Sequence, residues 1–366
     1  MRIFTFRIKG LLAALAILLT PLAAAAQSTA HDEDIDFVLD VLRTDYAGWE
    51  TKTGAGKEAD FERAVALARQ RIADNPEARM WALGALLDWF EDDHLTLRSK
   101  IVSPANPWAA DNARPARNFS PPPGEDFAFR RLSADTVLLR VPTFDIDYLE
   151  AFEALLAEHH DEITSTPNLL IDLRGNTGGS DQTYARLMSY LYTRPIYQIG
   201  VELRDTQRNL AALQANIDSG DYPAEVQEFV RNLLDRAAAS DSEFVPLSQD
   251  GFEIVTYPQV YAFPRRVGIL TEGAGSSGDQ FVIDARFSRK VTLLGAPTAG
   301  VIDYSNVITA PAPSGDFDLA WPMTRSMRLP EEPFDSVGVQ PDVPFPDGGV
   351  EDEIAWAQGW LERQAD

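Results

Sequence analysis

Hydrophobic residues recur at helical intervals over the first quarter of the chain. In the segment 32–49, four apolar positions lie three or four residues apart: Ile35, Val38, Leu39 and Leu42. Acidic residues fall in the first turn of this segment, which is typical of a helix N-terminus. The same period continues through 61–72 and 76–92. This pattern predicts a small helical domain over residues 27–102.

From Phe127 onward, short apolar runs alternate with amphipathic segments. The runs predict strands at 136–144, 168–174, 267–270 and 290–295, and the amphipathic segments predict helices at 147–163, 181–192 and 279–287. Strands that alternate with helices favour a parallel sheet covered by helices, which is an α/β fold. We therefore predict one α/β domain over 127–366, with a helical insertion at about 205–245. The Pro- and Asn-rich stretch 103–126 is predicted to be a linker or covering loop.

The first residues are typical of a secretory signal peptide. Arg2, Arg7 and Lys9 precede the apolar run 11–22, and the small residues of 23–28 provide a signal-peptidase site. A membrane anchor is the alternative, but the run is shorter than the roughly 20 apolar residues that cross a bilayer. We expect cleavage of 1–26, a periplasmic or secreted protein, and no stable membrane insertion afterwards.

Charge and cysteine content exclude several classes of partner and chemistry. Of the 366 residues 45% are hydrophobic, and removal of three positive charges with the signal takes the net charge from −24 to −27. So acidic a protein is a poor partner for nucleic acid and for anionic membranes. The chain has no cysteine, which excludes disulfides, thiolate nucleophiles, thiolate metal sites and a lipid-modified cysteine.

The stretch "GAGSSGDQF" (Gly273–Phe281) places two serines where a strand passes into a helix. A serine at such a corner is held out of the sheet, and the free N–H groups of the helix N-terminus favour a developing oxyanion. Gly-Ser clusters are more often plain turns. A second glycine-rich turn follows the strand in "LLIDLRGNTGGS" (Leu169–Ser180), and it matches neither phosphate-loop spacing. Its glycines permit close backbone approach to a ligand.

Together with "GVQPDV" (Gly338–Val343), these motifs closely resemble serine peptidase family 41, which includes tail-specific, C-terminal-processing and tricorn proteases. The resemblance extends from Phe127 to about Phe345 and implies a ClpP/crotonase-like α/β domain with a small N-terminal helical domain. It implies that Ser276 is the nucleophile. It also implies that Ser277 and either Gly178 or Gly179 supply the N–H groups of the oxyanion hole.

The general base departs from the processing branch of the family. Val301 stands where that branch has its lysine, 25 residues after the serine. Lys290 begins a strand and is expected to be solvated. Histidine is the alternative base because its pKa lies near 6.5. Among the four histidines, His31 is in the N-terminal tail, and His159 and His160 are expected to be solvated at a helix end. His94, in "EDDHLTL", resembles the D-x-H element of other branches and is the predicted base.

A carboxylate is expected to orient this base. Asp335 matches the position of a glutamate in the tricorn-like branch, and Asp93 and Asp303 are its competitors. The stretch 100–126 is too short for the PDZ domain of about 90 residues that processing proteases insert.

The sequence thus predicts a secreted serine peptidase that cleaves short or unfolded peptides and requires no metal or cofactor. The alternatives are a non-catalytic relative that binds lipid or peptide, and a serine esterase. The oligomeric state stays unknown.

Overall fold

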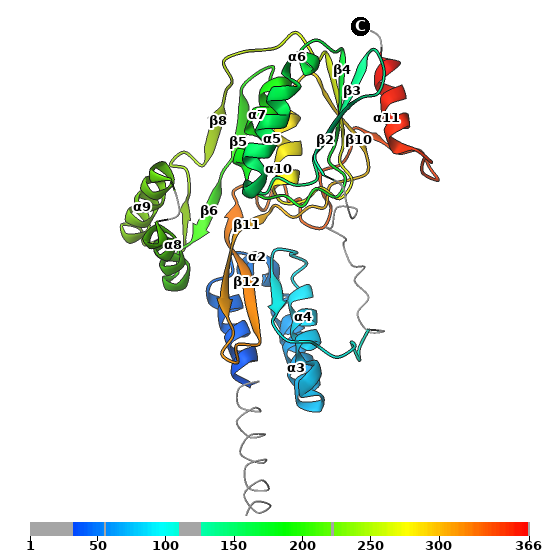
Figure 1. Ribbon diagram of the computed structural model, residues 1–366. Helices are drawn as coiled ribbons and strands as arrows, with labels where there is room; N and C mark the ends of the chain where they lie inside the picture. Colours follow the sequence, from blue (N-terminus) through cyan, green and yellow to red (C-terminus); the bar gives the residue numbers. More distant parts are fainter. Residues whose placement is uncertain (1–31, 55, 110–125, 221–222, 365–366) are drawn as a thin grey trace, which may run out of the picture. The chain divides into compact units, whose positions relative to one another are not determined.

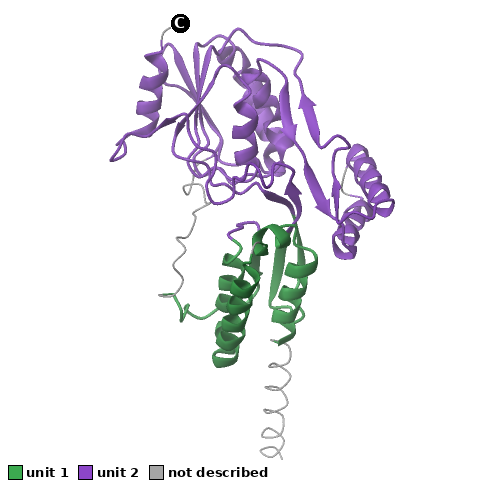
Figure 2. Cartoon of the chain, turned by 180° about the vertical axis from the view of Figure 1, so that it is seen from behind, with its two compact units in different colours: residues 1–90, 95–113, 307–321 green, residues 91–94, 114–306, 322–366 purple. Residues whose placement is uncertain are grey.

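The computed structural model describes residues 32–54, 56–109, 126–220 and 223–364. The chain divides into two compact units, each built from separate segments (Figure 2). Unit 1 comprises residues 1–90, 95–113 and 307–321, and unit 2 comprises residues 91–94, 114–306 and 322–366. The predicted signal 1–26, His31 and most of the predicted linker lie outside the described residues.

Unit 1 packs helices around an aromatic core. Residues 32–44 are helical, and they are followed by α2 (Trp49–Thr53), α3 (Glu58–Asp74), η1 (Pro76–Ala78) and α4 (Arg79–Asp88). Phe90 is buried and meets the rings of Tyr46 and Phe61 edge-on, at centroid distances of 5.3 and 5.4 Å. Such edge-to-face pairs stabilise a core beyond the area that they bury.

Unit 1 also contains strands, which the helical prediction did not include. β1 (Thr96–Ser99) pairs antiparallel with the first residues of β12 (Phe317–Ser326), and β12 pairs with β11 (Tyr304–Pro311). Buried Arg79 forms ion pairs with Asp34 and Asp316 and so links the helices to this hairpin. Residues 307–321 therefore belong to unit 1, although the predicted boundary assigned them to the catalytic domain.

The main sheet of unit 2 has the strand order β13-β10-β9-β4-β3-β2, and only the β2–β3 pair is antiparallel. Its strands are β2 (Ala128–Arg131), β3 (Thr136–Arg140), β4 (Asn168–Asp172), β9 (Arg266–Leu270), β10 (Val291–Gly295) and β13 (Val343–Pro344). β3 and β4 are buried along their whole length, as expected for parallel strands with both faces covered.

Helices cover both faces of this sheet (Figure 1). One face packs against α5 (Leu149–Glu158), which η2 (Ile146–Tyr148) precedes, and against α6 (His160–Ile163), α7 (Asp181–Leu191) and α10 (Ser277–Ala285). The other face packs against α11 (Glu353–Glu362). In β4, Leu169 contributes to the first core and Leu170 to the second, because successive strand residues point to opposite faces.

The remaining strands and helices of unit 2 form an extension from this core. β6 (Val201–Arg204) pairs with β7 (Phe244–Pro246) and with the end of β12, and β5 (Ile196–Ile199) pairs with β8 (Phe252–Val255). Two helices, α8 (Gln207–Ser219) and α9 (Ala224–Ala238), lie within the range predicted as a helical insertion. The fold is thus an α/β fold with an N-terminal helical region.

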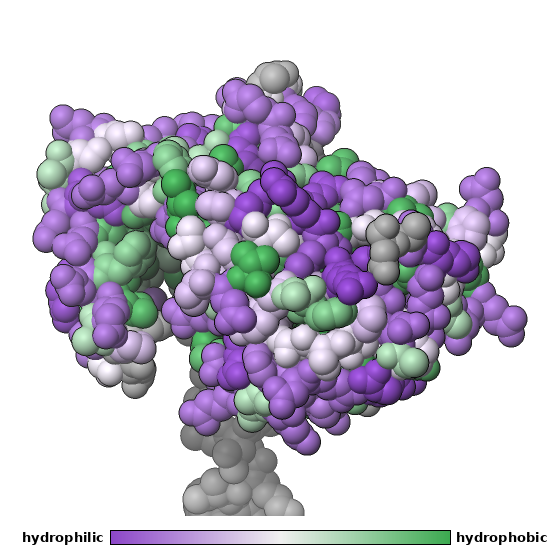
Figure 3. Space-filling model, turned by 90° about the horizontal axis from the view of Figure 1, so that it is seen from above, coloured by the Kyte–Doolittle hydropathy of each residue, from purple (hydrophilic) through white to green (hydrophobic). Residues whose placement is uncertain are grey.

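The face shown in Figure 3 is mostly hydrophilic, with small separate apolar patches. This agrees with the strongly acidic composition. Among the described helices, none has the length and apolar character needed to span a bilayer.

Candidate active site

Ser276 occupies the sharp turn that follows β9 and caps α10. Its backbone has φ 58° and ψ −121°, a strained conformation that is costly for a residue with a side chain and that is typical of the turns that present a nucleophilic serine. The turn is held by backbone hydrogen bonds: Gly275 N–H donates to the Asn176 carbonyl at 2.9 Å, and Gln280 N–H donates to the Ser276 carbonyl at 3.1 Å. The fold therefore holds Ser276 in a turn beyond the end of the sheet, as predicted from the sequence.

His94 lies against this serine, although 182 residues separate them. Its Nε2 is 3.1 Å from Ser276 Oγ, and its Nδ1 is 2.6 Å from the carbonyl oxygen of Tyr304. Because a carbonyl only accepts hydrogen bonds, Nδ1 carries the proton and Nε2 presents its lone pair to the serine hydroxyl. The backbone N–H of His94 donates to Asp92 Oδ1 at 2.9 Å, which fixes the loop. This is the arrangement that a general base needs.

The group that orients the imidazole is the Tyr304 carbonyl and not a carboxylate. None of the predicted candidates, Asp335, Asp93 or Asp303, hydrogen bonds a ring nitrogen of His94. The sequence could not indicate this partner because a main-chain carbonyl leaves no residue signature. The pKa of His94 is lowered by burial, and it is raised by the Tyr304 carbonyl and the charges of Asp335, Asp279 and Asp93. Asp335 thus acts on His94 through its charge.

Asp303 and Asp335 instead clamp two loops together. Asp335 Oδ1 accepts the backbone N–H groups of Ile302 and Asp303 at 3.1 and 3.0 Å. Reciprocally, Asp303 Oδ2 accepts those of Phe334 and Asp335, both at 2.8 Å. The clamped loop leads directly into Tyr304, so these two carboxylates hold the carbonyl that holds His94.

Asp279, three residues after Ser276, supports the same loop from α10. It is fully buried and accepts the N–H groups of Gly300 and Val301 at 3.1 and 2.9 Å. Burial raises the pKa of Asp279 to about 6. Val301, at the position of the processing-protease lysine, is buried. An aliphatic side chain there offers no base.

The predicted oxyanion donors differ in availability. Gly178 N–H already donates to Asn176 Oδ1 at 2.8 Å, so it is not a donor for the oxyanion. Gly178 still has to be glycine, because a Cβ there would lie 2.6 Å from Ser276 Cβ. Within the described part of the chain, the N–H groups of Gly179 and Ser277 have no hydrogen-bond acceptor, and they remain the candidate pair. Asn176 was missed, although asparagine in a glycine-rich turn is a known signal for such side-chain bonds.

The remaining serine, lysine and histidines point elsewhere. Ser277 Oγ donates to the Gly179 carbonyl at 3.1 Å. Lys290 is not solvated as expected, since its Nζ donates to the carbonyls of Tyr261 and Tyr190 at 2.7 and 3.4 Å. His160 Nδ1 lies 3.1 Å from the Tyr190 hydroxyl. None of these side chains contacts Ser276 Oγ.

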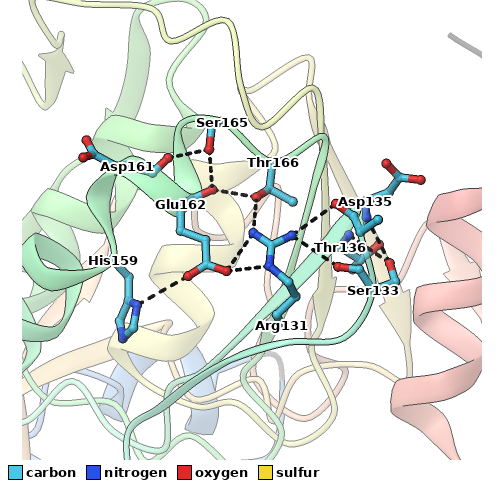
Figure 4. A network of polar contacts seen from close by, with 10 residues as sticks. Arg131, Ser133, Asp135, Thr136, His159, Asp161, Glu162, Ser165 and Thr166 are labelled. Atoms are coloured by element: carbon cyan, nitrogen blue, oxygen red, sulfur yellow. Dashed lines mark hydrogen bonds and ion pairs between the residues drawn. The ribbon is translucent and has the colours of Figure 1, made fainter.

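His159 also lies away from the serine, in the surface network of Figure 4. Its Nδ1 is 3.8 Å from a carboxylate oxygen of Glu162, which pairs with Arg131 at 2.7 Å. The ring stacks on Phe129 at 4.0 Å. Within the described residues, no cluster of three or more metal-ligating side chains is found.

The strained serine turn and the hydrogen-bonded histidine are typical of serine hydrolases. The chain belongs to peptidase family S41, because the model of that family matches residues 135–345. This assignment makes it a serine peptidase by family.

Solved structures share the fold at low sequence identity. Mature CPAF in complex with lactacystin is 14% identical, with 92% of this chain and 97% of that chain covered and a TM-score of 0.62. A protein from Parabacteroides merdae, assigned as a peptidase, is 17% identical, with 92% and 98% covered and a TM-score of 0.57. A lipoprotein from Streptococcus agalactiae is 13% identical, with 92% and 97% covered and a TM-score of 0.50. No curated protein sequence matches the chain.

The clamp makes a specific prediction for Asp335. Asp335→Asn keeps an oxygen for the two N–H groups but removes the charge that raises the pKa of His94. We expect the acid limb of the kcat/KM profile to move to lower pH, with a loss of turnover smaller than that of His94→Ala.

Asp335→Ala is the matched comparison, because it removes the acceptor as well as the charge. It should lower turnover further and reduce the free energy of unfolding by about 1–3 kcal/mol. The measurements are pH–rate profiles and denaturant titrations of both variants. An acid limb that stays in place in Asp335→Asn excludes the charge effect.

Proposed function

We propose that this chain is an exported serine peptidase that cleaves short or unfolded peptides through an acyl-enzyme on Ser276. The observation that carries the proposal is the His94 geometry, with Nε2 at 3.1 Å from Ser276 Oγ and Nδ1 bonded to a main-chain carbonyl. Export rests on the signal-like segment 1–26 alone.

In the proposed mechanism, His94 Nε2 takes the hydroxyl proton as Ser276 Oγ attacks the peptide carbonyl carbon. The oxyanion that forms is stabilised by the N–H groups of Gly179 and Ser277 and by the positive end of the α10 dipole. His94 then gives the proton to the leaving amine, which departs and leaves the acyl-enzyme. Water, deprotonated by the same imidazole, hydrolyses the ester and frees the serine.

Two other functions compete with this proposal. A binding protein of the same fold needs neither the strained turn nor a base aligned with the serine, and both features favour an enzyme. A serine esterase would use the same residues, so only substrates separate it from a peptidase. The acidic body disfavours nucleic acid as a partner.

Fluorophosphonate labelling tests the proposal. The exported protein, isolated from periplasm or medium, is expected to take one covalent label per active chain, and mass spectrometry should find its N-terminus near Gln27. Labelled protein should cleave neither peptide nor ester. The rates at which the unlabelled protein cleaves peptide and ester substrates would then be compared. Faster cleavage of peptides assigns a peptidase, and faster cleavage of esters assigns an esterase.

Absence of label on folded protein would favour the binding function. Label on a chain that still begins at Met1 would keep the enzyme and remove the export proposal.

A further inference from the structure

Arg328, just after β12, has a buried guanidinium group that forms no hydrogen bond within the described part of the chain. Four arginines of the described chain are at most 6% exposed: Arg79, Arg140, Arg204 and Arg328. The first three form ion pairs, with Asp34 and Asp316, with Asp172, and with Glu243. The guanidinium of Arg328 makes no hydrogen bond or ion pair with the described residues, and its Nε is buried without an acceptor. A buried charge left in this state is costly.

The position of Arg328 ties it to the framework of the catalytic pair. Ser326 N–H donates to the Asp303 carbonyl at 2.7 Å, and Arg328 N–H donates to Ser326 Oγ at 3.2 Å. The Arg328 Cζ lies 5.2 Å from the ring centroid of Phe334, whose N–H is held by Asp303. Asp303 immediately precedes Tyr304. Arg328 therefore sits beside the clamp that positions His94.

The surrounding carboxylates offset the charge of Arg328 but do not fill its donors. Burial lowers the pKa of Arg328, and the charges of Asp303, Glu332, Asp284 and Asp279 counter this only in part. Most of their oxygens serve other groups: Asp279 accepts from Gly300 and Val301, and Asp284 accepts from Tyr184, Gln198 and Gln280. Asp303 Oδ1 is buried and has no hydrogen-bond partner among the described residues.

The two Nη nitrogens of Arg328 differ from its Nε. They also make no hydrogen bond, but they are not among the polar atoms closed off from solvent. Two parallel N–H groups of a guanidinium match the two oxygens of a carboxylate. A bound carboxylate would supply acceptors for these donors, whereas a neutral amide would supply at most one weaker acceptor.

We propose that Arg328 binds a carboxylate of the peptide substrate, so that peptides carrying an additional negative charge are preferred. The carboxylate is either the free C-terminus or an Asp or Glu side chain. This inference rests on the proposed function in that the ligand is a peptide.

Binding to the Ser276→Ala protein tests the inference without turnover. The probes are three short N-acetylated alanine peptides: one with a free C-terminus, one with a C-terminal amide, and one amide with an internal glutamate. We expect one or both acidic peptides to bind about tenfold more tightly than the neutral amide, the size of one charged hydrogen bond. The salt concentration is held near physiological strength, because the net charge of −24 repels anionic peptides at low salt.

Variants of Arg328 then assign the preference. Arg328→Gln should abolish it, and Arg328→Lys should retain part of it, since lysine keeps the charge but loses the paired donors. Arg325→Gln is the matched control: Arg325 lies on β12 and is already paired with Glu202 at 2.7 Å, so the preference should persist. Circular dichroism melts of every variant show which proteins are folded.

Equal binding of acidic and neutral peptides would overturn the inference, as would a preference that survives in folded Arg328→Gln. If Arg328→Gln does not fold, the Arg328→Lys protein decides. A weakened preference for acidic peptides supports the inference, and an unchanged preference overturns it. An acid preference in a protein that takes no fluorophosphonate label would retain this site and reject the proposed peptidase.

Discussion

His94→Ala is expected to lower the turnover of a peptide substrate by roughly 10³–10⁶-fold, the loss seen when a member of a catalytic triad is removed. The reason is geometric: Nε2 of His94 is the ring nitrogen that faces Ser276 Oγ, at 3.1 Å. Lys290→Met is the control, because Lys290 bonds to the carbonyls of Tyr261 and Tyr190. It should change turnover little.

The dependence of kcat/KM on pH should also show that His94 is the base. Only the neutral imidazole accepts a proton, so kcat/KM should fall as pH drops through the pKa of His94. Burial outweighs the neighbouring carboxylates and lowers this pKa from its usual 6.5. The acid limb is therefore expected below pH 6.5 and not above it. Near wild-type turnover with an unchanged profile in His94→Ala would remove His94, and with it the role of the clamp, from the mechanism.

The two serines of the turn should respond in opposite ways. Ser276→Ala should fold, take no fluorophosphonate label and lose turnover by a factor similar to that of His94→Ala. Ser277→Ala should still be labelled and should keep turnover within about tenfold, because the oxyanion donor there is a backbone N–H that survives side-chain removal. Active-site titration and peptide mapping of the label measure both results.

The Ser277 side chain bonds to the Gly179 carbonyl at 3.1 Å, so its removal also tests whether that contact matters for the oxyanion site. Label found on Ser277, or equal labelling of wild type and Ser276→Ala, would exchange the roles of the two residues. Loss of label in both variants with retained fold would instead show that the turn acts as a unit.

Local pattern was sufficient to predict most of the helices and strands of the α/β domain. The short apolar runs between amphipathic segments predicted β3, β4, β9 and β10 and the helices between them. The spacing of apolar residues follows directly from the geometry of a buried strand or helix. Ser276 was singled out as the candidate nucleophile because it lies with its glycines in one turn and because that turn resembles the family motif. His94 required elimination among four histidines and the resemblance to the family.

Contacts between distant segments were decided only by the tertiary structure. The hairpin 307–321 joins unit 1 because strand pairing connects residues more than 200 positions apart, and no local period records such a pairing. The Nδ1 partner of His94 is a main-chain carbonyl, which every residue carries, so sequence reasoning chose a carboxylate instead.

The hydrogen bonds of Asp335 and the lack of an acceptor for Arg328 among the described residues could not be predicted from the sequence, for the same reason. An aspartate in a sequence shows its charge but not which N–H groups it will accept, and Asp335 proved to hold a loop. An arginine shows its donors but not whether the fold will supply an acceptor. The sequence by itself thus determined which chemical groups the site contains. The tertiary structure decided which of them meet, because hydrogen bonds depend on distances of a few tenths of an ångström that only the packed chain sets.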